Sequence, residues 1–182
     1  MNRTGTYVAF DGLGKTNPTE SDFRYYSTLQ AWSAGKKIDF KFVNSHDKTA
    51  AVRDTSLRST LESRIRARLA ASKNCIVILS DDTRKTGSML SYEIEKAVDL
   101  YEIPLICVYV GFEKINAPKA LSARWPNELT TRIDNGTANA IHVPFKKEIL
   151  LTAIKQFSVN ANSPGGSLVT YTNEAQEKMN SR

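Results

Sequence analysis

Short apolar runs alternate with amphipathic helical patterns along most of the 182-residue chain. The clearest run covers residues 74–80 and is apolar at every position from Cys75 to Leu79, which is typical of a strand covered on both faces. Further strands are expected at residues 6–10, 38–43, 104–110 and 140–143, and helices at residues 21–34, 55–71, 88–101 and 144–157. Strands that alternate with helices in this way form parallel sheets.

This order of elements predicts an α/β fold, namely a flavodoxin-like three-layer sandwich. Its parallel five-stranded sheet is expected to have the order 2-1-3-4-5, with helices on both faces. Residues 1–157 are expected to complete this domain, and residues 158–182 to form a polar, loosely held C-terminal extension. Ligands of such sheets bind beyond the carboxyl ends of the strands, at the switch point between the first and third strands. The loops at 11–20, 44–54 and 81–87 are therefore the candidate site loops.

The lengths of the apolar runs and the positions of the cysteines indicate in which cellular compartment the protein is located. No apolar run approaches the roughly 20 residues that a membrane helix needs, and the first residues lead into a strand without the apolar core of a signal peptide. These features predict a cytoplasmic protein with no membrane partner. Cys75 and Cys107 each lie inside an apolar run, so both are expected to be reduced, buried thiols. No CxxC motif is present and the two histidines, His46 and His142, are far apart, so no metal site is expected.

The net charge of +6 raises the question of a nucleic-acid partner. The clearest basic cluster includes Arg64, Arg66 and Arg68, which alternate with Ile65 and Leu69 in the helix expected at 55–71. The arginines thus occupy the solvated side of an amphipathic helix. No aromatic residues are interleaved with them, as a platform for stacked bases would require. A nucleic-acid partner is therefore not expected.

Residues 9–16 match the relaxed phosphate-loop pattern Ala/Gly-x4-Gly-Lys-Ser/Thr. A phosphate loop has its first glycine after the strand and continues directly into a helix. Here Ala9 lies within the expected strand, and Pro18 disfavours a helix that starts at Thr16. A P-loop nucleotide-binding protein is therefore only an alternative interpretation.

A phospho-acceptor domain is a further alternative with the same strand order. Asp11, Asp81 and Asp82 stand near the ends of the first and third strands, where such a domain has its acidic pocket. The domain also needs a lysine at the end of the fifth strand, and Lys146 lies beyond that strand. This interpretation is less favoured for that reason.

Glu93 is the carboxylate best placed for chemistry. It lies beside the apolar face that begins at Leu90 in the helix expected at 88–101, whereas Glu95 and Asp99 should face water. Glu93 is also near the N-terminus of that helix, and so near the carboxyl edge of the sheet. A carboxylate in this place can point into the switch-point crevice.

Two sets of motifs carry a resemblance to a known family. The sequence Ser-Met-Leu-Ser-Tyr-Glu-Ile-Glu-Lys-Ala at 88–97, preceded by the strand at 75–80, resembles the third strand and following helix of bacterial TIR-like domains. The opening Tyr-Val-Ala-Phe at 7–10, with Asp-Phe-Arg at 22–24, is similar to the start of the TIR-like proteins of Thoeris anti-phage systems. The resemblance spans about residues 6–112 and implies a TIR-like version of the predicted fold.

In that family, the glutamate that matches Glu93 is the catalytic residue of NAD⁺ cleavage, and the product is a cyclised or otherwise modified ADP-ribose signal. Glycoside hydrolysis ordinarily needs two carboxylates, because one of them must protonate the leaving oxygen. Nicotinamide leaves a cationic pyridinium as a neutral molecule, so one carboxylate can be enough. Glu93 would stabilise the oxocarbenium-like transition state. The resemblance therefore implies NAD⁺ as a substrate and neither a cofactor nor a metal.

The resemblance also suggests which residues surround the substrate. The expected contacts are Phe10, Asp11, Gly12, Ser80, Arg84, Met89 and Tyr92. Arg84 would pair with the pyrophosphate, and the loop at 44–54 would match the mobile loop that TIR domains use for assembly and site closure. Met89 stands where these domains typically have a tryptophan, which leaves open how the substrate ring is stacked.

The implied partners are the NAD⁺ substrate and a separate downstream effector that senses the product, and the family also allows a homo-oligomer. The departure at Met89 keeps a second interpretation open. In this interpretation, the chain is a non-catalytic TIR-like scaffold that recruits partners through homotypic contacts.

Overall fold

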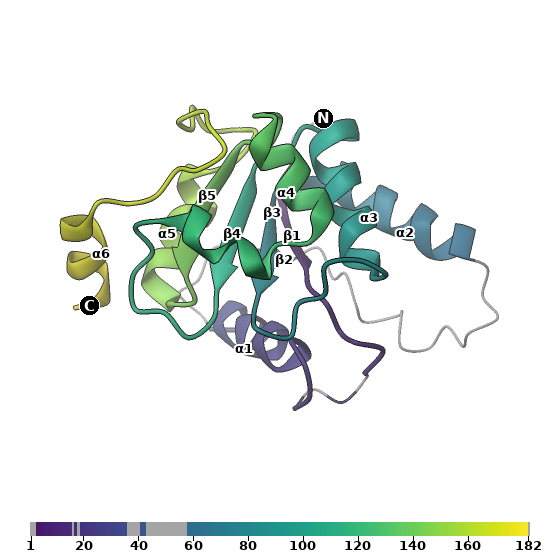
Figure 1. Ribbon diagram of the computed structural model, residues 1–182, viewed down its shortest axis with the longest axis horizontal. Helices are drawn as coiled ribbons and strands as arrows, with labels where there is room; N and C mark the ends of the chain where they lie inside the picture. The colour runs from purple at the N-terminus through teal and green to yellow at the C-terminus, as the bar shows by residue number, and fades with distance from the viewer. Residues whose placement is uncertain (1–2, 16, 18, 36–40, 43–57, 182) are drawn as a thin grey trace.

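The computed structural model, shown in Figure 1, describes residues 3–15, 17, 19–35, 41–42 and 58–181. Its parallel sheet has the order β2-β1-β3-β4-β5. The strands are β1 (Gly5–Ala9), β2 (Lys41–Phe42), β3 (Ser72–Leu79), β4 (Leu105–Tyr109) and β5 (Ala140–Pro144). The parallel α/β architecture that the sequence predicts is confirmed. The loop at 44–54 lies outside the described residues.

Helices cover both faces of the sheet. They are α1 (Phe23–Ser33), α2 (Arg58–Ala70), α3 (Met89–Glu95), the π-helical turn η1 (Lys96–Leu100), the 3₁₀ turn η2 (Pro118–Arg124), α4 (Asn127–Asp134), α5 (Lys147–Gln156) and α6 (Asn173–Asn180). Val8 and Phe10 pack toward α1 and α5, whereas Tyr7 and Ala9 pack toward α2, α3 and α4 (Figure 1). None of these helices combines the length and apolarity needed to cross a bilayer.

The helix expected at 88–101 divides into two parts. After α3, the chain widens into the π-helical turn η1, in which the Tyr101 amide donates to the Lys96 carbonyl at 3.1 Å. Asp99 on this turn is exposed, as expected, and its carboxylate also accepts a hydrogen bond of 2.9 Å from Nε of the buried Arg132 on α4. The contact therefore links the turn η1, which lies between α3 and β4, to α4.

No helix was among those expected between the strands at 104–110 and 140–143, yet this segment contains η2 and α4. Trp125 and Leu129 are fully buried there, and Ile133 is nearly so. With eight residues, α4 shows only two turns of periodicity, which is too short for a reliable pattern in sequence.

The C-terminal segment is not loosely held, so this part of the sequence prediction is wrong. The Ala140 amide donates to Gly166 O at 2.8 Å, the His142 amide donates to Val169 O at 2.8 Å, and the Val169 amide donates to Ala140 O at 3.1 Å. Ile141 and Val169 form an isolated parallel bridge. The segment therefore extends the edge of the sheet beyond β5. The domain boundary at residue 157 stays a prediction.

Helix α6 has one buried polar side chain that anchors it, Gln176. Gln176 is almost fully buried, and its Oε1 accepts the Ile115 amide at 2.9 Å. Its Nε2 donates to Ile115 O at 3.1 Å and to Tyr171 O at 2.9 Å. Figure 1 shows α6 beside α5, at the opposite end of the molecule from α2. A polar anchor of this kind does not produce an apolar periodicity, so the sequence pattern did not reveal it.

Candidate active site

Asp11, which follows β1, is buried at the carboxyl edge of the sheet. The Arg84 guanidinium donates two hydrogen bonds of 2.8 Å to the Asp11 carboxylate, from Nε to Oδ2 and from Nη2 to Oδ1. The Arg84 and Leu13 amides donate to the same carboxylate at 3.1 Å each. Burial by itself raises the pKa of Asp11, but these bonds outweigh it and hold the pKa below its usual value. Arg84, which was expected to contact the pyrophosphate, therefore uses its guanidinium on Asp11.

Asp22 is a second buried carboxylate at this edge, directly before α1. Its Oδ2 accepts a bond of 3.4 Å from Thr83 Oγ1, and the Ser80 side chain also hydrogen-bonds to it. Its Oδ1 has no hydrogen-bond partner among the described residues. Burial raises the pKa of Asp22 to about 6; the Ser80 and Thr83 bonds oppose this shift, and the charges of Asp82 and Asp11 add to it.

Glu93 turns from α3 toward the sheet and is only 3% exposed. Its Oε1 accepts a hydrogen bond of 2.6 Å from the Tyr7 hydroxyl in the middle of β1. Its Oε2 is buried and, within the described part of the chain, has no partner. Burial raises the pKa of Glu93 to about 8; the Tyr7 bond and the charge of Arg68 lower it, and the charge of Asp11 raises it further. The carboxyl group is therefore mostly protonated at pH 7.

The other residues expected near the carboxyl edge lie close to Asp11 in sequence or structure. Phe10 is buried in the core beside α1, where its ring stacks on Tyr26 at 5.2 Å between centroids. The Gly12 carbonyl accepts a bond of 3.1 Å from Ser21 Oγ. Ser80 is buried and belongs to the Asp22 network. The structure thus brings Asp11 and Arg84 together, links Ser80 to Asp22, and buries Phe10 in the core.

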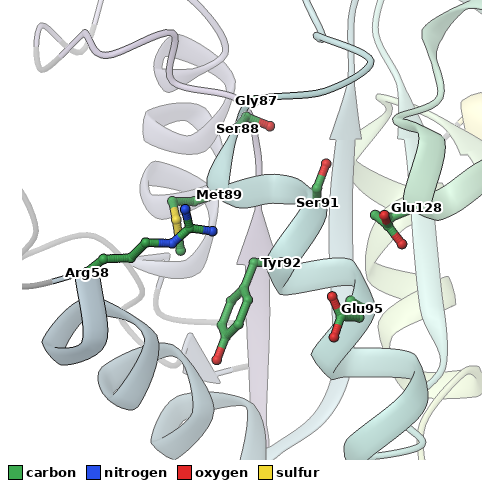
Figure 2. A pocket seen from close by; sticks show the side chains of 8 residues that line it. All are labelled: Arg58, Gly87, Ser88, Met89, Ser91, Tyr92, Glu95 and Glu128. Carbon is green, nitrogen blue, oxygen red and sulfur yellow. The ribbon is translucent and has the colours of Figure 1, made fainter.

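Met89 and Tyr92 lie elsewhere, in a pocket of about 360 Å³ on the outer side of α3. The pocket is lined by Arg58, Gly87, Ser88, Met89, Ser91, Tyr92, Glu95 and Glu128. In Figure 2, Arg58 reaches toward Met89 from α2, and Glu128 faces α3 from α4. Glu95, expected in water, is half-buried here and pairs with Lys96. Glu93 is not among the lining residues that the structure describes, so the two groups of expected contacts are separate.

A comparison with known protein families shows to which family this chain belongs. Residues 7–115, more than half of the chain, match the family model of the Thoeris protein ThsB, TIR-like domain. The chain belongs to this family. The matched segment of this TIR-like domain contains Asp11, Asp22, the residues that bond to them, and Glu93. Membership implies a role in anti-phage defence together with other defence components.

Three residues of the site, Tyr7, Asp22 and Thr83, were not predicted as functional. Tyr7 and Asp22 appeared only within the motifs of the resemblance, and Thr83 only within the candidate loop at 81–87. Asp22 does carry a sequence signal, because an aspartate at the start of an expected amphipathic helix is typical of a helix start, and the candidate loop at 11–20 ends just before it. Tyr7 carries none, because it resembles any aromatic residue of a buried strand.

The geometry of this TIR-like domain departs from a P-loop. The Lys15 amide donates to Gly12 O at 2.8 Å in a tight turn, and its ammonium lies 3.7 Å from Glu20. The next helix, α1, begins only at Phe23. Among the described residues between Lys15 and α1, which are 17 and 19–22, none is helical, so they do not form the helix start that would aim amides at a phosphate.

Neither cysteine belongs to the site. Cys75 and Cys107 are free and buried, which confirms the expectation of core thiols. In the part of the chain that the structure describes, no group of three or more His, Cys, Asp or Glu side chains is arranged to hold a metal ion. His142 is engaged in the core, where its Nδ1 accepts from the Tyr109 hydroxyl at 2.7 Å and its Nε2 donates to Ser167 O at 2.8 Å.

Proposed function

We propose that this TIR-like domain cleaves the bond between nicotinamide and ribose in NAD⁺, with Glu93 as the catalytic residue. One observation carries the proposal: the Glu93 carboxyl group is buried and held at Oε1 by Tyr7, while Oε2 has no partner among the described residues. A buried polar atom without a partner costs free energy. Such groups, with strongly shifted pKa values, are concentrated at functional sites.

Tyr7 would orient the carboxyl group and leave Oε2 for the hydroxyls of the nicotinamide ribose. The positive pyridinium ring would favour the ionised carboxylate, so substrate binding would lower the raised pKa of Glu93. As the carbon–nitrogen bond breaks, both bonding electrons leave with nicotinamide, which becomes neutral. The carboxylate then stabilises the cationic ribose until a nucleophile attacks it. No general acid and no cofactor is required.

Because Glu93 is only 3% exposed, substrate access requires movement of side chains around it. In this proposal, residues 1–157 form the catalytic domain and residues 158–182 an extension packed on it. The product is an ADP-ribose-derived signal, cyclic or otherwise modified, which acts on a separate effector in anti-phage defence. The expected pyrophosphate contact of Arg84 would require its guanidinium to serve Asp11 and the substrate together.

The test is nicotinamide release from NAD⁺, followed by chromatography, with purified protein and with extracts of phage-infected cells that express it. Glu93→Gln should lower release by on the order of 100-fold or more, because it removes the charge that stabilises the transition state. Glu102→Gln, an exposed glutamate directly after the same helical segment, is the matched control, and its release should stay within about twofold. Equal release by wild type and Glu93→Gln would overturn the proposal.

The outer pocket supports a second candidate function, a non-catalytic scaffold. Met89 and Tyr92 line that pocket apart from Glu93. Apolar side chains that gather on one part of the surface are typical of protein-binding sites. Concentration-dependent assembly of a protein that releases no nicotinamide would favour this function.

A further inference from the structure

Two carboxylates from separate elements hold the loop that leads from β3 to α3. Asp11, at the end of β1, binds the side chain and the amide of Arg84. Asp22, directly before α1, binds the Thr83 and Ser80 side chains. The first helical residue of α3 is Met89, only a few residues further along the chain. The start of α3 is therefore tied to β1 and α1 through these contacts.

The Asp22 contacts form a closed network. Thr83 Oγ1 donates to Asp22 Oδ2 at 3.4 Å and accepts the Ser80 amide at 2.9 Å. Ser80 Oγ accepts the Asp82 amide at 3.1 Å and is the second side chain bonded to Asp22. Both hydroxyls are thus oriented with their protons toward the carboxylate. Their other hydrogen bonds shape the turn at 80–83 itself.

Asp22 keeps this position in spite of an unfavourable environment. Its side chain is fully buried, and Oδ1 has no partner in the described ranges. The charges that act on it from the neighbouring elements are those of Asp11 and Asp82, both acidic, while the guanidinium of Arg84 is engaged by Asp11. A residue that only capped α1 would not need this burial, and Asp22 makes no side-chain cap bond.

We propose that Asp22 is a positioning residue, which holds Ser80 and Thr83 so that α3 begins in the place that directs Glu93 against Tyr7. For its catalytic consequence, this inference rests on the proposed cleavage of NAD⁺. Asp22 does not touch the reacting atoms in this scheme. It acts through the 80–84 loop and the first turn of α3.

The charge of Asp22 supplies a signature that a merely structural residue would lack. Its hydroxyl bonds are charge-assisted only while the carboxylate is ionised. Burial, opposed by the Ser80 and Thr83 bonds and reinforced by Asp82 and Asp11, raises its pKa to about 6. Acidification through this pKa should therefore loosen the loop and lower kcat. Asp22→Asn, which does not titrate, should lose this acidic limb of the pH profile.

The first measurement is amide hydrogen exchange of residues 80–90 in the full chain at neutral pH, which does not depend on activity. Thr83→Ala and Asp22→Asn should each speed exchange there by on the order of 10-fold, because a bond that holds the loop is lost. Thr83→Ser should restore the wild-type rate. Thr86→Ala is the matched control, since Thr86 is an exposed threonine of the same loop. Wild-type exchange in both Thr83→Ala and Asp22→Asn would overturn the proposal.

The second measurement is nicotinamide release by the same variants. Thr83→Ala should lower kcat by on the order of 10-fold with KM within about twofold, because Glu93 is displaced while most binding contacts remain. Thr83→Ser should recover most of kcat. Faster exchange with an unchanged kcat would overturn the positioning role. If the wild type releases no nicotinamide, the proposed function fails, and the exchange data alone decide whether Asp22 holds the loop.

Discussion

Replacement of Glu93 by glutamine should stabilise the protein at neutral pH, although it removes the proposed catalytic carboxyl group. The pKa of Glu93 is raised by burial to about 8, against 4.5 for an unperturbed glutamate. As the pH rises from 4.5, the unfolded chain releases the Glu93 proton while the folded chain retains it. The free energy of unfolding therefore falls with rising pH, and this loss ends once the pH has passed the folded-state pKa.

The size of the effect follows from these two values. At pH 7 the unfolded state has passed its pKa by about 2.5 pH units, and each unit is equivalent to about 1.36 kcal/mol, so Glu93 costs about 3 kcal/mol. Glutamine has nearly the same shape and carries no proton to release, and its amide can still accept the Tyr7 hydroxyl. Glu93→Gln should therefore gain about 3 kcal/mol at pH 7, or roughly 6–12 °C in Tm.

The assay is urea unfolding of wild type and Glu93→Gln between pH 4.5 and 9, followed by fluorescence of the buried Trp125. The difference between the two free energies of unfolding reports the contribution of Glu93, because both proteins contain every other titrating group. It should be near zero at pH 4.5, grow up to about pH 8, and then stay constant. Glu95→Gln should stay within about 0.5 kcal/mol of wild type throughout. A variant less stable than wild type at pH 7, or a difference independent of pH, would refute the reasoning.

Two further predictions concern the C-terminal segment and its anchors. Burial lowers the pKa of His142 to about 4 from 6.5, so the unfolded chain binds this proton first on acidification and stability is lost as the pH falls from 6.5 toward 4. Urea unfolding at pH 7 and pH 4.5 should give a smaller difference for His142→Gln than for wild type, and an equal difference would count against this assignment. Gln176→Ala should cost about 1–3 kcal/mol, because it leaves buried backbone groups unpaired, and should speed hydrogen exchange in α6. The exposed Lys178→Ala on the same helix is the control, and equal losses in both variants would contradict the anchoring role of Gln176.

Local sequence patterns were sufficient for the layered architecture. A strand covered by helices on both faces must be apolar throughout, so β3 and β4 are visible as continuous apolar runs. Helices that cover a sheet must repeat their apolar residues with the helical period, which identified α1 and α5. The motif around Glu93 carried the family resemblance, because it lies within one helix and the strand before it.

The same local reasoning did not find the short or polar elements. Helix α4 has too few turns for its periodicity to be distinguished from chance. Helix α6 has little apolar surface and is held by the buried amide of Gln176, whose partner Ile115 lies 61 residues away. Such an anchor has no periodic signature, so the sequence alone indicated a loose extension.

The sequence by itself determined the alternation of the five strands with α1, α2, α3 and α5, and it identified Glu93 as the carboxylate to consider. Only the tertiary structure decided what surrounds that carboxylate. Glu93 meets Tyr7 across 86 residues of sequence, and Thr83 meets Asp22 across 61. Burial and neighbouring charges set the pKa of each carboxyl group, and both depend on side chains brought together from distant positions. Local periodicity records which face of an element is buried, but it contains no information on which distant side chain lies against that face.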